Sequence, residues 1–174
     1  MKILWRFLIL LILTGAWYAW DADSRYNFNF QCPNPDDVRI FNQDNISDIR
    51  LHYQKYFGQN RFRFPRDTVA KVMVRKNIPF VSVFTKYQLP PESLNALLQF
   101  LNNPDNFTWQ NNTMLYSQAD YIIDFYNTNQ KHTGKLWLCS TCGTLKAVPF
   151  SPNMKFGYIK KDKLSILMKI VGMN

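Results

Sequence analysis

Two cysteines separated by two residues, Cys139 and Cys142, form the pair whose spacing carries the most chemical information in the sequence. A C-x-x-C pair can act as a redox-active dithiol, supply half of a tetrahedral zinc site, or form a structural disulfide. The sequence has three cysteines, and the third is Cys32. Because the total is odd, one cysteine must be free, bonded to another chain or bound to a metal.

The residues after the cysteine pair argue against redox catalysis. A redox pair of the thioredoxin type places its first cysteine at a helix N-terminus, where the helix dipole lowers the pKa of the thiol. Here Gly143 is followed by Thr-Leu-Lys-Ala-Val, which is typical of a strand, and Pro149 ends this run. The pair is therefore expected between strands and away from a helix N-terminus.

The remaining two interpretations of the pair are a zinc site and a disulfide. Zinc needs four ligands, and the sequence has no second C-x-x-C, so the candidate set is Cys139, Cys142, Cys32 and His132. A disulfide formed in an oxidising compartment is favoured. Cys139 with Cys142 is the local pairing, and Cys32 with either of them is the alternative.

The elements that position the cysteines are a predicted hairpin and two helices. Residues 121–126 are typical of a strand, residues 127–130 of a turn, and residues 135–139 of a return strand that leads to Cys139. A helix is predicted from Pro91, and its apolar residues recur at i, i+3, i+4 and i+7. These residues are Leu94, Leu97, Leu98 and Leu101.

A second apolar stripe predicts a C-terminal helix that ends at Gly172, with Leu164, Leu167, Met168 and Val171 on its packing face.

Further upstream, residues 69–75 and 78–87 are predicted to form an antiparallel pair. Residues 61–66 alternate arginine with phenylalanine, which favours a half-buried extended edge. Residues 106–112 are expected to form a polar turn.

Together these patterns predict an α+β fold, in which an antiparallel sheet has two or three helices packed on one face. The expected organisation is a membrane anchor over residues 1–20, a linker over residues 21–44 and one domain over residues 45–174.

The helix ending near Asn102, the strand at 121–126, the C-x-x-C and the terminal helix resemble small uncharacterised bacterial exported proteins with a strand-borne C-x-x-C. The resemblance covers residues 94–171. It implies an α+β domain at the cell envelope.

The N-terminal residues predict a membrane helix. Residues 7–20 carry no charge, Lys2 and Arg6 precede them, and Asp21 and Asp23 follow them. An apolar stretch of about 17 residues is near the lower limit for spanning a bilayer, and basic residues before it favour a cytoplasmic N-terminus. The expected location is a bacterial inner membrane with the body in the periplasm. The side chains expected to contact lipid include Phe7, Leu10, Leu13, Trp17 and Trp20.

The competing interpretation of this segment is a cleaved signal peptide. Thr14, Gly15 and Ala16 are small residues at the spacing required for cleavage after Ala16. The aromatic residues near its end favour the uncleaved anchor, because such residues gather at membrane interfaces.

The net charge of +9 favours anionic neighbours, such as a phospholipid surface or an acidic protein. The basic residues are spread along the chain, and no DNA- or RNA-binding pattern is present, so nucleic acid is not expected as a partner. Two clusters are candidates for anionic contact, although solvated surface charge is the simpler interpretation. They consist of Arg61, Arg63 and Arg66, and of Lys160, Lys161 and Lys163.

The sequence carries no catalytic signature, such as G-x-S-x-G, H-E-x-x-H or a glycine-rich phosphate loop. Asp120 and Asp124 lie four residues apart and are interpreted as surface carboxylates. We therefore expect a non-enzymatic interaction protein without a cofactor or small-molecule substrate, as an accessory subunit of an envelope complex or an immunity-type inhibitor. The alternative is a zinc-binding or thiol-active domain that uses Cys139 and Cys142.

Overall fold

A five-stranded antiparallel sheet forms the centre of the computed structural model, which describes residues 2–25, 63–78, 81–109, 119–149, 151–155 and 157–173. Its strand order is β2-β1-β4-β5-β6. These strands are β1 (Lys71–Lys76), β2 (Tyr87–Gln88), β4 (Tyr121–Tyr126), β5 (His132–Leu138) and β6 (Leu145–Val148). A smaller sheet pairs β3 (Phe107–Trp109) with β7 (Gly157–Ile159).

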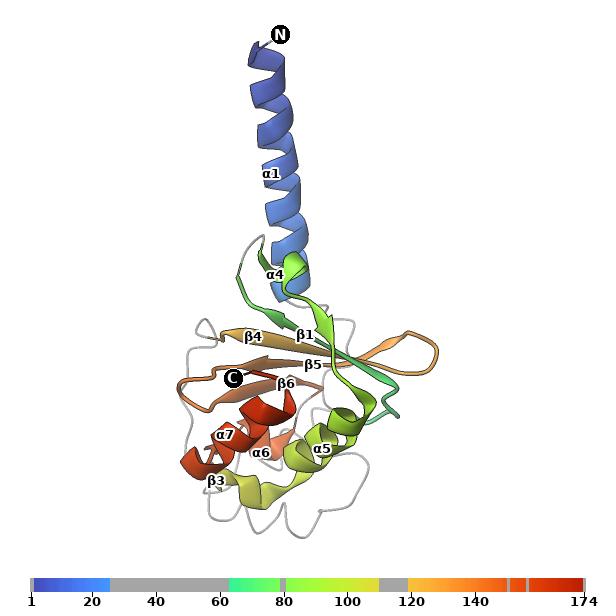
Figure 1. Cartoon of the computed structure of the whole chain (residues 1–174), viewed down its shortest axis with the longest axis vertical. Coiled ribbons are helices and arrows are strands. Elements are labelled where there is room, and N and C mark those ends of the chain that lie inside the picture. Colours follow the sequence, from blue (N-terminus) through green and yellow to red (C-terminus); the bar gives the residue numbers. More distant parts are fainter. Residues whose placement is uncertain are drawn as a thin grey trace, which may run out of the picture.

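The helices are α1 (Lys2–Arg25), α4 (Val81–Phe84), α5 (Pro91–Asn102), α6 (Pro152–Lys155) and α7 (Lys161–Ile170), with a short 3₁₀ helix, η2 (Pro104–Asn106). Figure 1 shows α5, α6 and α7 together on one side of the five-stranded sheet, whereas α1 extends away from it. The α+β fold predicted from the sequence is thus confirmed.

The elements with the strongest sequence patterns lie where the sequence predicts them. The hairpin of β4 and β5 is antiparallel and pairs Asp124 with Lys135. Helix α5 begins at Pro91 and ends at Asn102. Helix α7 ends at Ile170, and Gly172 just after it has a φ of 71°. The N–H of Met173 then donates to the carbonyl of Met168 at 2.8 Å, which satisfies a helix C-terminal carbonyl.

Three weaker predictions are wrong. In the described part of residues 78–88, Val81–Phe84 form the helix α4, and Tyr87 and Gln88 pair with β1. Pro79 has no N–H to donate to a strand ladder, so the apolar run around it is a poor candidate for a strand. Residues 107–109, predicted as part of a polar turn, form β3 because β7 provides a pairing partner. Residues 63–67 form bends instead of an extended edge.

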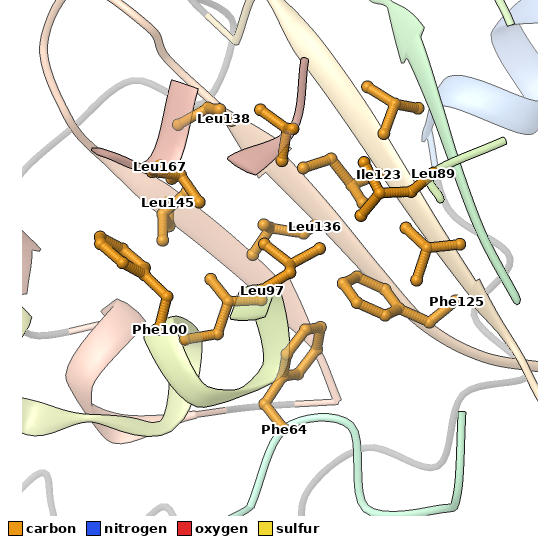
Figure 2. Close-up of a cluster of buried hydrophobic side chains, with 14 of the residues drawn as sticks. Phe64, Leu89, Leu97, Phe100, Ile123, Phe125, Leu136, Leu138, Leu145 and Leu167 are labelled. Atoms are coloured by element: carbon orange, nitrogen blue, oxygen red, sulfur yellow. The ribbon is translucent and has the colours of Figure 1, made fainter. Parts of the chain in front are cut away.

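The apolar core lies between the sheet and α5, α6 and α7. One face of the sheet contributes Val72, Val74, Ile123, Phe125, Leu136, Leu138 and Leu145. Leu97 and Phe100 from α5 and Leu167 from α7 pack against this face (Figure 2). Because side chains alternate along a strand, the residues between these positions must point to the opposite face.

The segment around Phe64 closes one end of this core. The ring of Phe64 meets that of Phe125 edge to face, with ring centroids 5.1 Å apart. Asn102, at the end of α5, accepts from the N–H of Phe64 at 2.7 Å and donates to its carbonyl at 2.6 Å. A Cβ at Gly134 would lie 3.0 Å from Pro65, so a larger residue at this position of β5 would have to push Pro65 away. The core face of the hairpin is therefore matched closely to residues 64 and 65.

Candidate functional site

Charged side chains are buried on the sheet face opposite α5, α6 and α7. Arg75 in β1, Asp124 in β4 and Lys135 in β5 are 3%, 3% and 2% exposed. Their neighbours along each strand, including Val74, Phe125 and Leu136, lie in the apolar core. The register of the sheet brings the three charged positions together, because Asp124 is directly opposite Lys135, and Arg75 is opposite Ile122, two residues from Asp124 on the same strand.

Asp124 is the centre of this cluster. Its Oδ1 accepts a hydrogen bond from Nε2 of His132 at 2.9 Å and lies 3.5 Å from Nζ of Lys135. Its Oδ2 accepts from Nε of Arg75 at 3.3 Å. Because a carboxylate only accepts hydrogen bonds, His132 must carry its proton on Nε2 here. The carboxylate on β4 thus joins side chains from both neighbouring strands, β1 and β5, and Arg75 on β1 lies 49 residues away from it in the sequence.

A β-bulge brings His132 to this face. Phe125 pairs with Gly134, but the next residue, Tyr126, pairs with His132, so Thr133 is an extra residue in β5. If β5 were regular from His132 to Gly134, strict alternation would place His132 on the same face as Gly134, which is the core face. The hydroxyl of Thr133 donates to the carbonyl of Phe125 at 3.3 Å, within the bulge. The bulge therefore supplies the fourth member of the cluster.

The environment of Asp124 lowers the pKa of its carboxyl group. Burial alone would raise that pKa, but the hydrogen bond from His132 and the charges of Lys135 and Arg75 together outweigh it. The pKa falls below the ordinary value of 3.8. A carboxylate that stays ionised at neutral pH, with each oxygen engaged by a cation or a ring N–H, is poorly suited to act as a general acid or base.

Aromatic rings border the charged cluster on the same face. Nζ of Lys135 lies 5.8 Å and Nζ of Lys146 lies 5.3 Å from the centroid of the Trp137 ring. Burial lowers the pKa of Lys146. At the hairpin end, the rings of Tyr126 and His132 are 5.0 Å apart. Cation–π contacts of this kind stabilise lysine ammonium groups over ring faces.

The second candidate site is the turn between β5 and β6, which contains both cysteines. Cys139 and Cys142 form a disulfide, which confirms the predicted disulfide and selects the local pairing from the two that the sequence left open. The N–H of Gly143 donates to the carbonyl of Cys139, and the N–H of Cys139 donates to the carbonyl of Thr144, both at 3.0 Å. As predicted, the pair lies between strands and not at a helix N-terminus.

Asp120 and β7 hold this turn from two sides. The carboxylate of Asp120 accepts from the N–H of Ser140 at 2.8 Å and from its hydroxyl at 2.6 Å. The carbonyl of Gly143 accepts from the N–H of Ile159 at 2.7 Å. Gly143 has a φ of 69°, a left-handed conformation that favours glycine. The turn is therefore fixed by backbone and side-chain hydrogen bonds in addition to the disulfide.

The structure does not bring His132 to the cysteines. His132 begins β5, whereas Cys139 follows the end of that strand, and the His132 ring is bonded to Asp124. Within the described part of the chain, no three His, Cys, Asp or Glu side chains gather as a possible metal site. Cys32, the remaining member of the predicted zinc set, lies outside the described residues.

The basic clusters predicted for anionic contact are only partly described. Arg63 and Lys161 are exposed, and Arg61 lies outside the described residues. Three members are half-buried: Arg66, Lys160 and Lys163. Nζ of Lys163 lies 3.6 Å from Oδ2 of the adjacent Asp162, a surface ion pair.

The anchor residues lie on α1, where the described side chains, residues 3–17, are all exposed. Phe7 is 67% and Leu10 is 63% exposed, and Leu13 and Trp17 are also exposed. The side chain of Trp20 lies outside the described residues. In the described residues, no helix has both the length and the apolar character needed to cross a membrane.

The charged cluster was missed by sequence reasoning. The interpretation of Asp124 as a surface carboxylate is wrong, because it is buried and paired. The signal was in the strand itself, since Ile122 and Ile123 before Asp124 and Phe125 after it are apolar at consecutive positions. Such a run predicts a strand buried on both faces, and a charge within it has to be paired.

Replacing Asp124 with asparagine removes the negative charge but keeps the shape of the side chain. We expect Asp124→Asn to lower the free energy of unfolding by about 3–5 kcal/mol, because Arg75 and Lys135 are left buried without a counter-charge. Urea unfolding of the full chain in mild detergent measures this change. The matched control is Asp162→Asn, whose carboxylate is also ion-paired but 70% exposed, and which should change stability by less than about 0.5 kcal/mol. Equal effects would contradict the assignment.

The lowered pKa of Asp124 also predicts a dependence of stability on pH. Because the pKa of the folded state is below that of the unfolded state, the stabilisation is present above about pH 4 and is lost as the pH falls through the folded pKa. Thermal unfolding of the wild type and Asp124→Asn at about pH 7 and about pH 2 should show the difference in stability narrowing in acid. A difference that stays constant or widens would show that the carboxylate is not stabilised in the folded state.

No protein-family model, curated protein or solved structure matches the chain. Of the resemblance drawn from the sequence, what stands is the C-x-x-C pair at disulfide distance in the C-terminal half. The function therefore has to be argued from the geometry and charge of this chain.

Proposed function

We propose that the protein is held at a bacterial inner membrane by α1 and that its body binds a protein partner on the periplasmic side, without catalysing a reaction. The observation that carries this proposal is the exposure of α1. Ile3, Leu4 and Leu11 are 72%, 75% and 70% exposed, and apolar side chains surround the helix on all sides. Removing such surface from water is worth about 25 cal/mol per Å², which favours its insertion into lipid.

The flanking charges support one orientation of the helix. Lys2 and Arg6 lie at its start, and Asp21 and Asp23 lie near its end. Basic residues favour the cytoplasmic side of a first membrane segment, so the body is expected on the other side. The disulfide of Cys139 and Cys142 supports this orientation, because disulfides persist in oxidising compartments such as the periplasm.

A binding role is supported by the way the buried charges are used. In the described part of the chain, the buried charged side chains are Arg75, Asp124 and Lys135, and they are paired with one another. They therefore hold the sheet together instead of facing a substrate. The net charge of +9 favours an acidic protein as the partner. An accessory subunit of an envelope complex and an immunity-type inhibitor of a toxin are the two partner relationships that fit.

Charged substitutions in α1 test the anchor. We expect the wild-type chain to stay with bacterial membranes in alkaline carbonate, and Leu10→Asp/Leu13→Asp to be extracted, because each aspartate near a helix centre costs about 2.5–3.5 kcal/mol in lipid. The control Thr14→Leu keeps the segment apolar and should stay in the membrane fraction. The intact mass of the mature chain is measured in parallel. A chain cleaved after Ala16, or a wild-type chain released by carbonate, would refute the anchor.

A native gel of the chain, tagged at its C-terminus and solubilised from membranes in mild detergent, tests the binding role. We expect a complex with a second protein that dissociates as salt is raised from about 0.05 M to about 0.5 M, because salt screens an interaction between a basic surface and an acidic one. A monomer at low salt in freshly solubilised membranes would contradict the proposal.

A further inference from the structure

We propose that the Cys139–Cys142 disulfide is a thiol-exchange site. In this reaction the thiolate of a dithiol reductant attacks Sγ of Cys142 and releases Cys139 as a thiolate. The reductant would be a small-molecule or protein dithiol on the side of the membrane where the body lies. The exchange takes place at the turn between β5 and β6, whichever partner the body binds.

The two cysteine residues differ in their exposure to solvent. Cys142 is exposed, whereas Cys139 is 3% exposed. Exchange requires the incoming thiolate to reach one sulfur from the side opposite the other, so access decides which sulfur is attacked. The attack is therefore directed to Cys142. In a redox pair of the thioredoxin type the first cysteine is the reactive one, so the order here is the reverse.

The surroundings of Cys139 favour its release as a thiolate. The N–H of Cys142 donates to Sγ of Cys139 at 3.2 Å. Oγ1 of Thr141 lies 3.3 Å from the same sulfur, and its hydroxyl must be the donor because a disulfide sulfur carries no hydrogen. Hydrogen bonds to the charged form lower the pKa of a thiol, and a leaving thiolate of lower pKa leaves faster.

The turn keeps its geometry when the disulfide opens. The carbonyl of Cys139 accepts from Gly143, and its N–H donates to Thr144. Ser140 is bonded to Asp120 through both its N–H and its hydroxyl. None of these hydrogen bonds involves a sulfur atom. Cys139 therefore remains beside Cys142 after the first step, and the exchange is reversible.

The reaction balances in two steps. In the first, the S–S bond of the protein breaks, a bond forms between the reductant and Sγ of Cys142, and the electron pair stays on Sγ of Cys139. In the second, the other thiolate of the reductant attacks the reductant sulfur that is bonded to Cys142. The mixed disulfide breaks, and Cys142 is released as a thiolate. The reductant is oxidised to a disulfide, and the protein gains two electrons and, once the thiolates are protonated, two protons.

Mass spectrometry of the full chain in mild detergent locates the attacked sulfur. Reduced glutathione, a monothiol, is used to trap the mixed disulfide under native conditions, and remaining thiols are alkylated after acid quenching. Fragment masses of the peptide that contains both cysteines distinguish them, and Cys32 falls on a different tryptic peptide. We expect the adduct on Cys142. An adduct on Cys139 would overturn the proposal. A disulfide that is reduced no faster than the whole protein unfolds, with the unfolding rate measured in urea, would also overturn it.

Two threonine variants test the release of Cys139. Thr141→Val removes the hydroxyl that donates to Sγ of Cys139 and should slow reduction by dithiothreitol about threefold to tenfold, the effect of one hydrogen bond. The matched control is Thr144→Val, which removes a hydroxyl 3.2 Å from Sγ of Cys142, the sulfur under attack. It should not slow the reaction. Equal slowing in both variants, or none in Thr141→Val, would overturn the proposed role of Cys139. Circular dichroism checks that both variants fold.

Discussion

A carboxylate that is 3% exposed must find its counter-charges inside the protein, because the cost of removing an ion from water is several kcal/mol. Asp124 finds them in Arg75 on one neighbouring strand and in Lys135 on the other, and it also accepts a hydrogen bond from His132. This requirement fixes the register of three strands at once. A slip of β4 by one residue would turn Asp124 into the apolar core and would move Phe125 to the charged face.

The same register determines the positions of the other features. Strand β5 begins at His132, in the ion cluster, and leads to Cys139, so the pairing that places Lys135 opposite Asp124 also sets where the disulfide turn begins. On the opposite face, the sheet presents the apolar surface on which α5 and α7 pack (Figure 2). The charged cluster is thus a structural element of the sheet, and the thiol exchange that we propose takes place at the turn between β5 and β6.

The sequence predicts the elements whose signals are local. The apolar spacing of α5, the glycine that ends α7 and the hairpin that leads to Cys139 all depend on residues close together in the chain, and all three predictions are confirmed. The strand at residues 107–109 was missed because its partner, β7, lies about fifty residues further along the chain. The charged cluster was missed for a related reason, since Arg75 and Asp124 meet only through the pairing of β1 with β4. The bulge that turns His132 towards them has no sequence signature.

The pairing of β1 with β4 depends most on the interaction between Arg75 and Asp124. A double-mutant cycle measures this interaction directly. Arg75→Gln, Asp124→Asn and the double variant are compared with the wild type by the free energy of unfolding. If the charged cluster stabilises the sheet, the double variant should lose less free energy of unfolding than the two single variants lose together. The expected difference is about 1–3 kcal/mol. Effects that simply add would show that the two side chains do not stabilise each other, and would contradict the central role of Asp124 in the sheet.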